Sequence, residues 1–115
     1  MTNQDVTNKR KSARHLSSET IYVSCGNETI KGEMKDISLY GMRFAANRKI
    51  PENMVIGINI NYYPVNFIQR GWVVWSKTSG LGWEYGVEFI NISSVHNLLL
   101  EDLMQKIILD ESKGR

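Results

Sequence analysis

Between residues 20 and 91 the sequence repeats short runs in which apolar and polar residues alternate. Ile56, Ile58 and Ile60, for example, alternate with Gly57 and Asn59, a pattern typical of a strand with one buried and one solvent-facing side. Several short strands at close spacing pack most readily by closing a sheet on itself. The pattern therefore predicts an all-β-dominated fold, a closed or nearly closed antiparallel barrel.

Turn-forming residues divide this stretch into six strands. Gly26 and Asn27 predict a two-residue turn, Pro64 should separate two strands, and residues 77–82 predict a hairpin loop. The predicted strands cover residues 20–26, 28–38 and 41–47, two segments on either side of Pro64 within 54–76, and residues 83–91.

The end of the chain changes to helical periodicity, and either Ser93 or Ser94 can cap a helix from about Val95 to Leu109. We expect the barrel to bury an apolar stripe made of Val95, Leu99, Leu103 and Ile107. A second stripe consists of Leu100, Met104 and Ile108. Periodicity alone does not decide whether this second stripe also packs on the barrel or contacts a partner, such as a second copy in a homodimer.

Charge is distributed unevenly along the chain. Residues 1–18 carry four Lys or Arg residues and one acidic residue, Asp5, whereas the remainder carries ten basic and eleven acidic residues. Few large apolar side chains occur in the first 18 residues, which predicts a flexible basic arm that either binds an anion or only aids solubility. A slightly acidic body disfavours a broad nucleic-acid-binding surface. The predicted organisation is an arm over residues 1–18, a barrel over 19–92 and a helix over 93–111.

Residues for metal or nucleophilic chemistry are scarce. His15 and His96 lie near opposite ends of the chain, and Cys25 is the single cysteine, so no clustered ligand set or disulfide is expected. No phosphate-binding glycine motif opens a helix. These features predict a protein that is not an enzyme and needs no metal or cofactor. Without a signal peptide or a long apolar run, it is expected to be cytoplasmic and not inserted in a membrane.

Two short motifs flank the first predicted strand. Arg10 and Arg14 form RxxxR in the arm, and Asp36, Ser38 and Gly41 form DxSxxG between the second and third predicted strands. Each motif alone is weak, because basic arms often contain RxxxR and DxSxxG is compatible with an ordinary polar turn. Their joint presence in this order is much more specific.

With these motifs the sequence resembles the PilZ domain family, whose members bind the bacterial second messenger cyclic di-GMP through an RxxxR arm and a [DN]xSxxG segment. Residues 70–76 and 85–89 also resemble the later strands of that family. The resemblance covers about residues 9–111 and implies a six-stranded antiparallel barrel with a C-terminal helix. It further implies that cyclic di-GMP is the ligand.

The resemblance assigns the binding site to Arg10, Arg14, Asp36, Ser38 and Gly41. Guanidinium groups bind phosphate or guanine in a forked geometry, and a carboxylate accepts the N1 and N2 protons of guanine. Trp75 is a further candidate that either stacks on a base or packs on the barrel. We expect Trp72, at an odd offset from Trp75, to face the opposite side of its strand.

The function predicted from these observations is a receptor. Cyclic di-GMP would bridge the arm and the barrel, order the arm and transmit the signal to a protein partner. Two alternatives remain at this point: a small barrel that binds single-stranded nucleic acid, and a PilZ-like interaction module without a ligand.

Overall fold

The structure is a computed structural model that describes residues 15–16 and 19–114. It contains a single long helix, α2 (Ser94–Gly114), in the described part of the chain. The strands, in chain order, are β1 (His15–Leu16), β2 (Thr20–Cys25), β3 (Glu28–Ile37), β4 (Gly41–Ala46), β5 (Val55–Tyr62), β6 (Val65–Ser79) and β7 (Gly82–Phe89).

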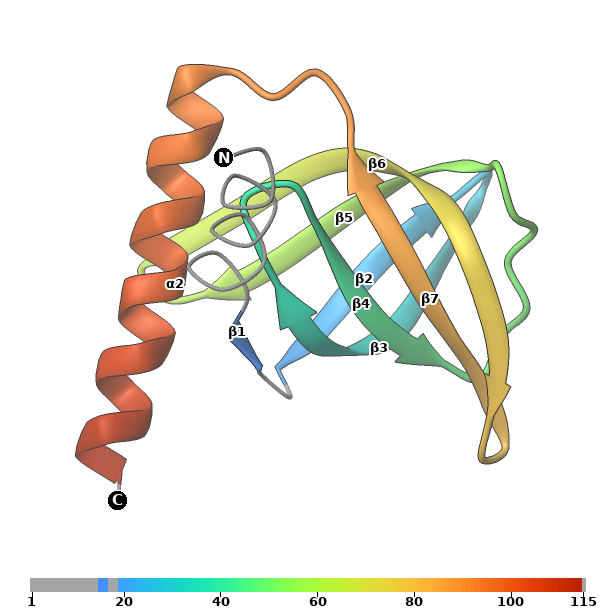
Figure 1. Ribbon diagram of the computed structural model, residues 1–115, viewed down its shortest axis with the longest axis horizontal. Helices are drawn as coiled ribbons and strands as arrows, with labels where there is room; N and C mark the ends of the chain where they lie inside the picture. The colour runs from blue at the N-terminus through green and yellow to red at the C-terminus, as the bar shows by residue number, and fades with distance from the viewer. Residues whose placement is uncertain (1–14, 17–18, 115) are drawn as a thin grey trace, which may run out of the picture.

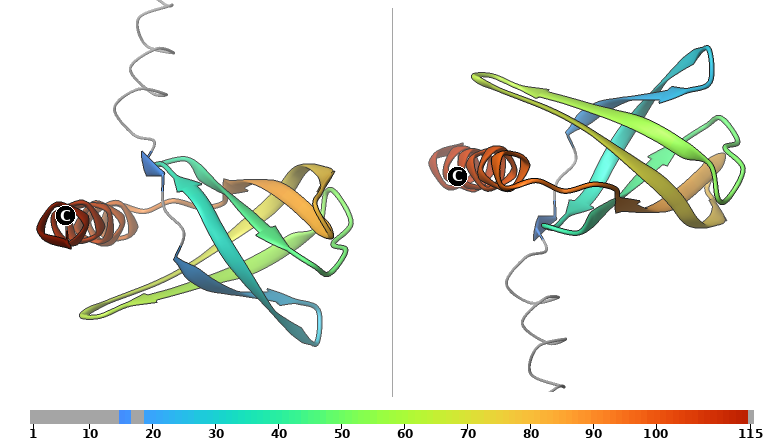
Figure 2. Two further views of the ribbon diagram at one scale, coloured as in Figure 1. Left: turned by 90° about the horizontal axis from the view of Figure 1, so that it is seen from below. Right: turned by 90° about the horizontal axis from the view of Figure 1, so that it is seen from above.

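Six of these strands close into an antiparallel barrel, as the sequence predicted. The strand order is β3-β2-β5-β6-β7-β4, and β4 pairs back onto β3. Figures 1 and 2 show the strongly twisted strands crossing one another, with α2 lying along one side of the barrel. The two-residue strand β1 is additional and pairs with the end of β3.

The turns lie close to the positions predicted from the sequence. Gly26 has a φ of 62° in the turn between β2 and β3, a conformation that favours glycine. Pro64 lies in the connection between β5 and β6. The predicted loop over residues 77–82 is shorter than expected, because β6 continues to Ser79 and only Gly80 and Leu81 form the turn. Cross-strand pairing with β7 extends this strand beyond what local sequence indicates.

The core fills the barrel interior with side chains from alternate strand positions. Phe44 and Tyr85 pack with their ring centroids 5.1 Å apart, and both are fully buried. The Tyr85 hydroxyl donates to the Arg48 carbonyl at 2.8 Å and accepts the Ile50 amide at 2.7 Å. These bonds anchor the connection between β4 and β5 on the barrel.

A serine side chain caps the N-terminus of helix α2. The Ser93 hydroxyl accepts the backbone amide of His96 at 3.1 Å, which settles the choice between Ser93 and Ser94. The His96 ring packs against Phe67 and Phe89, with centroid distances of 4.8 and 5.6 Å. Burial lowers the pKa of His96 below its ordinary value. Among the described residues, no helix is both long enough and apolar enough to cross a membrane.

The rotation of α2 differs from the prediction. His96, Leu100, Leu103 and Ile107 form the face buried against the barrel, and Met104 is also buried. Val95 and Leu99, predicted to be buried, are exposed, whereas Leu100 and Met104 of the predicted second stripe belong to the core. Ile108, the third residue of that stripe, is exposed. Both stripes are apolar, so only the packing of His96 on two phenylalanines and the barrel surface determines which face is buried.

A polar contact attaches the C-terminal part of α2 to the hairpin between β5 and β6. The Tyr62 hydroxyl donates to Asp110 Oδ2 at 2.8 Å. Partial burial, this hydrogen bond and the negative charges of Asp110, Glu19 and Glu111 raise the pKa of Tyr62 to about 12. The helix is therefore held at both ends, by the aromatic cluster around His96 and by Tyr62.

Candidate functional site

Strand β1 pairs with the segment that contains the second motif. His15 pairs with Ile37, and Leu16 pairs with Asp36 on the neighbouring strand. The residue that follows Arg14 in the chain is thus paired directly with the segment that contains Asp36 and Ser38. Arg10 and Arg14 themselves lie outside the described residues.

Ser38 organises the turn that joins β3 to β4. Its hydroxyl accepts the amides of Tyr40 and Gly41, at 3.2 and 3.3 Å, and lies 3.3 Å from the Gly41 carbonyl. The Ser38 amide donates to the same carbonyl at 2.8 Å. This is a typical local use of serine in a tight turn. A structural role for Ser38 therefore exists in the absence of ligand.

Gly41 is required by the close approach of two strands. A Cβ atom at this position would overlap the backbone carbonyl of Val87 on β7. Gly41 pairs with Glu88 across these strands. A larger residue would push β4 away from β7 and change the shape of the adjoining surface.

Asp36 is buried and ion-paired. Its side chain is only 2% exposed, and its Oδ2 accepts Arg43 Nε at 2.8 Å. A shift in register between Met34 and Asp36 brings Asp36 opposite Arg43, so both side chains lie on the outer face of the barrel. The Asp36 carboxylate is therefore covered in this structure and lies next to the partly exposed Arg43 side chain.

Arg43 connects Asp36 to a second carboxylate. Its Nη1 lies 3.3 Å from Glu84 Oε2, and Lys77 Nζ lies 3.4 Å from Glu84 Oε1. One third of the Arg43 side chain remains exposed. Arg43 is not among the site residues predicted from the sequence, although its position two residues after Gly41 on the same strand places both on one face.

Trp75 lies on the same outer face. Its indole covers Gly86, where a Cβ atom would overlap the ring. The prediction that Trp72 faces the opposite side is wrong, because the register shifts between Val73 and Trp75. Trp72 and Trp75 consequently pair with Glu88 and Gly86, two positions that share a face of β7.

The turn between β3 and β4 and the strands β4, β6 and β7 border an open hollow of about 380 Å³. Ser38, Gly41 and Trp75, three of the predicted site residues, line it together with Arg43. The remaining lining comes from Tyr40, Met42, Val74, Gly86, Val87 and Glu88. The hollow is bordered by a turn, an arginine and a partly exposed indole, a combination suited to a ligand with anionic and aromatic parts.

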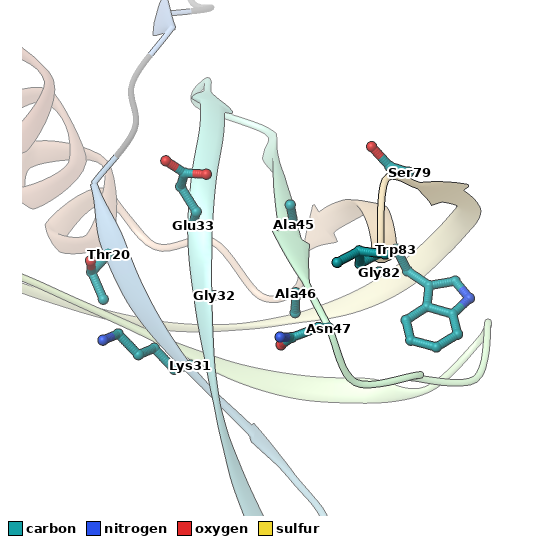
Figure 3. Close-up of a pocket in the computed structure, with 11 residues that line it drawn as sticks. Thr20, Lys31, Gly32, Glu33, Ala45, Ala46, Asn47, Ser79, Gly82 and Trp83 are labelled. Carbon is teal, nitrogen blue, oxygen red and sulfur yellow. The ribbon is translucent and has the colours of Figure 1, made fainter.

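A second open hollow, of about 350 Å³, is lined by described residues that do not belong to DxSxxG. Figure 3 shows lining side chains from β2, β3, β4 and the hairpin between β6 and β7, including Lys31, Glu33 and Trp83. The Ala45 backbone lies close to Gly32, and the Ala46 backbone lies close to Gly82. Small residues at crossing strands account for this space, and none of the predicted site residues within the described part of the chain lines it.

The described residues form a small antiparallel barrel with a C-terminal helix, and the candidate site lies on its outer face, close to the segment that pairs with β1. The family model for the PilZ domain matches residues 8–106, and the chain belongs to this family. A search of curated protein sequences finds no match to the chain.

Solved structures with the same fold are distant in sequence. The PilZ domain of YcgR from Escherichia coli with c-di-GMP is 16% identical, with a TM-score of 0.71 over 91% of this chain and 96% of the other. The PilZ domain of CeSA from a cellulose-synthesizing bacterium is 13% identical, with a TM-score of 0.65 over 82% and 96%. PlzA from Borreliella burgdorferi in complex with c-di-GMP is 16% identical, with a TM-score of 0.58 over 88% of this chain and 43% of PlzA.

Proposed function

We propose that the protein is a non-catalytic receptor for cyclic di-GMP. Membership of the PilZ domain family supports this proposal, as do similar structures of YcgR and PlzA that contain c-di-GMP. The observation that carries it is the pairing of β1 with the segment around Asp36, beside the hollow that Ser38, Gly41, Arg43 and Trp75 line. In this proposal RxxxR, which ends at the residue before β1, would meet DxSxxG at one site.

The chemistry of the site matches the ligand. Cyclic di-GMP carries two phosphates and two guanine bases, and Arg10 and Arg14 would bind phosphate or the O6 and N7 atoms of guanine in a forked geometry. Trp75 would contact a base face. Arg43 adds a guanidinium group that Asp36 and Glu84 hold in place.

Ligand binding would act as a signal by ordering the arm. Each residue of the arm that becomes fixed costs about 1 kcal/mol or more of conformational free energy, so the contacts with phosphate and base must exceed this cost. Charge-assisted hydrogen bonds from two arginines are strong enough to do so. The ordered arm would then present a new surface to a protein partner.

Isothermal titration calorimetry tests the proposal directly. The protein is titrated with cyclic di-GMP and, separately, with a short single-stranded oligonucleotide. Saturable binding of cyclic di-GMP alone supports a receptor. Tighter binding of the oligonucleotide would instead indicate a nucleic-acid-binding barrel, and no heat with either would indicate an interaction module without ligand.

A further inference from the structure

Helix α2 exposes apolar side chains on a flank that does not contact the barrel. Val95 and Leu98 are about two thirds exposed, and Leu109 is 55% exposed. Leu99, at 42%, lies on the same flank. Figure 1 shows the helix along one edge of the molecule, and both views of Figure 2 show it standing clear of the strands on its outer side.

These residues follow the spacing of a coiled-coil seam. Val95, Leu99, Asp102, Lys106 and Leu109 are separated alternately by four and three positions. At about 100° per residue, the seam lies roughly 110° around the helix from the buried line of Leu100, Leu103 and Ile107. The two lines are therefore distinct, and the seam remains available after the helix has packed on its barrel.

The two charged residues at the centre of the seam have no ion-pair partner among the described residues. Neither Asp102 nor Lys106 takes part in the salt bridges of the structure, although they are four positions apart on the same helix. Asp102 is exposed and Lys106 is partly exposed. An acid and a base of this kind can pair with the opposite charges of a second helix.

The order of residues along the seam is self-complementary in one orientation. Leu99 and Asp102 precede residue 104 by five and two positions, and Lys106 and Leu109 follow it by the same intervals. An antiparallel two-fold axis at residue 104 therefore places Asp102 against Lys106 of the second copy and Leu99 against Leu109 of the second copy. Parallel pairing in register would place like charges together, which is unfavourable.

We propose that α2 mediates a homodimer in which two copies pair antiparallel through Leu99, Asp102, Lys106 and Leu109. The leucine pairs provide apolar burial, and the two Asp–Lys pairs select the orientation. The helix is 21 residues long, about 31 Å, so this contact is smaller than a standard interface. The dimer should thus exchange with monomer in a concentration-dependent manner. The seam lies apart from the hollow around Trp75, and dimerisation does not depend on the proposed ligand.

Variants with reversed charges at Asp102 and Lys106 test the proposed dimer. Sedimentation velocity over a concentration series, at low salt and without added nucleotide, should show wild-type protein passing from monomer to dimer. Asp102→Lys and Lys106→Asp should each shift the apparent dissociation constant at least tenfold towards monomer, because each creates two like-charge contacts. The double variant, with both changes, should dimerise like the wild type, because the pairs are restored with reversed polarity.

Glu101→Lys is the matched control. It changes the charge by the same amount at an exposed position next to the seam and should leave dimerisation unchanged. Far-ultraviolet circular dichroism verifies that each variant keeps its fold. A wild-type protein that stays monomeric throughout the series, or a double variant no more dimeric than the single ones, would overturn the proposal. An equal loss of dimer in Glu101→Lys would do so as well.

Discussion

At the residue scale, the proposed function requires Asp36 and Arg43 to recognise the edge of guanine, so the buried Asp36 carboxylate has to become accessible to the ligand. A guanidinium group can donate to O6 and N7, and a carboxylate can accept from N1 and N2. Adenine carries an amino group in place of O6 and an unprotonated N1. If the pair reads the base, the site should discriminate between two cyclic dinucleotides that have identical phosphates.

We predict that the protein binds cyclic di-GMP at least about a hundredfold more tightly than cyclic di-AMP, because each lost bidentate contact costs roughly 1–3 kcal/mol. Asp36→Asn should narrow this difference, since an amide can donate to adenine N1. Calorimetric titration of both proteins with both nucleotides measures the effect. Equal affinity of the wild-type protein for the two ligands would exclude base readout by Asp36.

Tyr85 provides a test of stability independent of ligand. Tyr85→Phe removes the hydroxyl that joins Arg48 and Ile50 and leaves a buried amide without its partner, because Ile50 is 1% exposed. We expect a loss of about 1–3 kcal/mol in the free energy of unfolding, measured by urea denaturation. Tyr22→Phe, at an exposed tyrosine, is the control and should change it little.

At the scale of elements, the attachment of α2 depends on the uncharged form of His96. Burial between Phe67 and Phe89 lowers the pKa of His96 in the folded protein below the ordinary value of 6.5. The unfolded chain therefore binds a proton more readily than the folded one as the pH falls through about 6.5. Stability from this contact is complete above that pH and is lost progressively below it.

We accordingly predict that the melting temperature of the wild-type protein falls between about pH 7.5 and about pH 5.5. His96→Leu, which keeps an apolar side chain between the two rings, should show a smaller decrease over the same range. Thermal denaturation followed by circular dichroism compares the two. Identical pH dependence of both proteins would mean that carboxylates elsewhere, and not His96, control the transition.

At the scale of the whole molecule, closure of the barrel and the pairing of β1 with β3 place His15 and Leu16 on the segment that leads to the hollow at Ser38. The arm carries lysines as well as arginines, so bulk charge and specific contacts make different predictions. A lysine supplies a point charge, whereas an arginine supplies a planar fork.

Arg10→Ala and Arg14→Ala should each weaken binding of cyclic di-GMP more than Lys9→Ala or Lys11→Ala, by roughly tenfold or more if one forked contact is lost. The four variants remove the same charge from the same arm, so the lysine variants control for electrostatics. Calorimetry provides the affinities, and circular dichroism should be the same for all four. Comparable losses in the lysine and arginine variants would show that the arm acts through charge alone.

The amino-acid sequence by itself determined the strands, their turns and the two motifs. Alternation of apolar residues and the conformational preferences of glycine and proline are local properties. The strands and turns can therefore be identified without a structure from Gly26, Pro64 and the alternating isoleucines of β5. The family resemblance depended on short motifs that are also local, Asp36 to Gly41 among them.

Only the tertiary structure decided the rotation of α2 and the arrangement of side chains on the outer face. Which apolar stripe of the helix is buried depends on its contacts with Phe67 and Phe89, residues remote in the sequence. The common face of Trp72 and Trp75 depends on a register shift against β7, and the position of Arg43 depends on carboxylates from two other strands. Contacts between segments remote in the sequence, whether strand pairing or side-chain packing, determine each of these features, and the pattern within one segment does not reveal them.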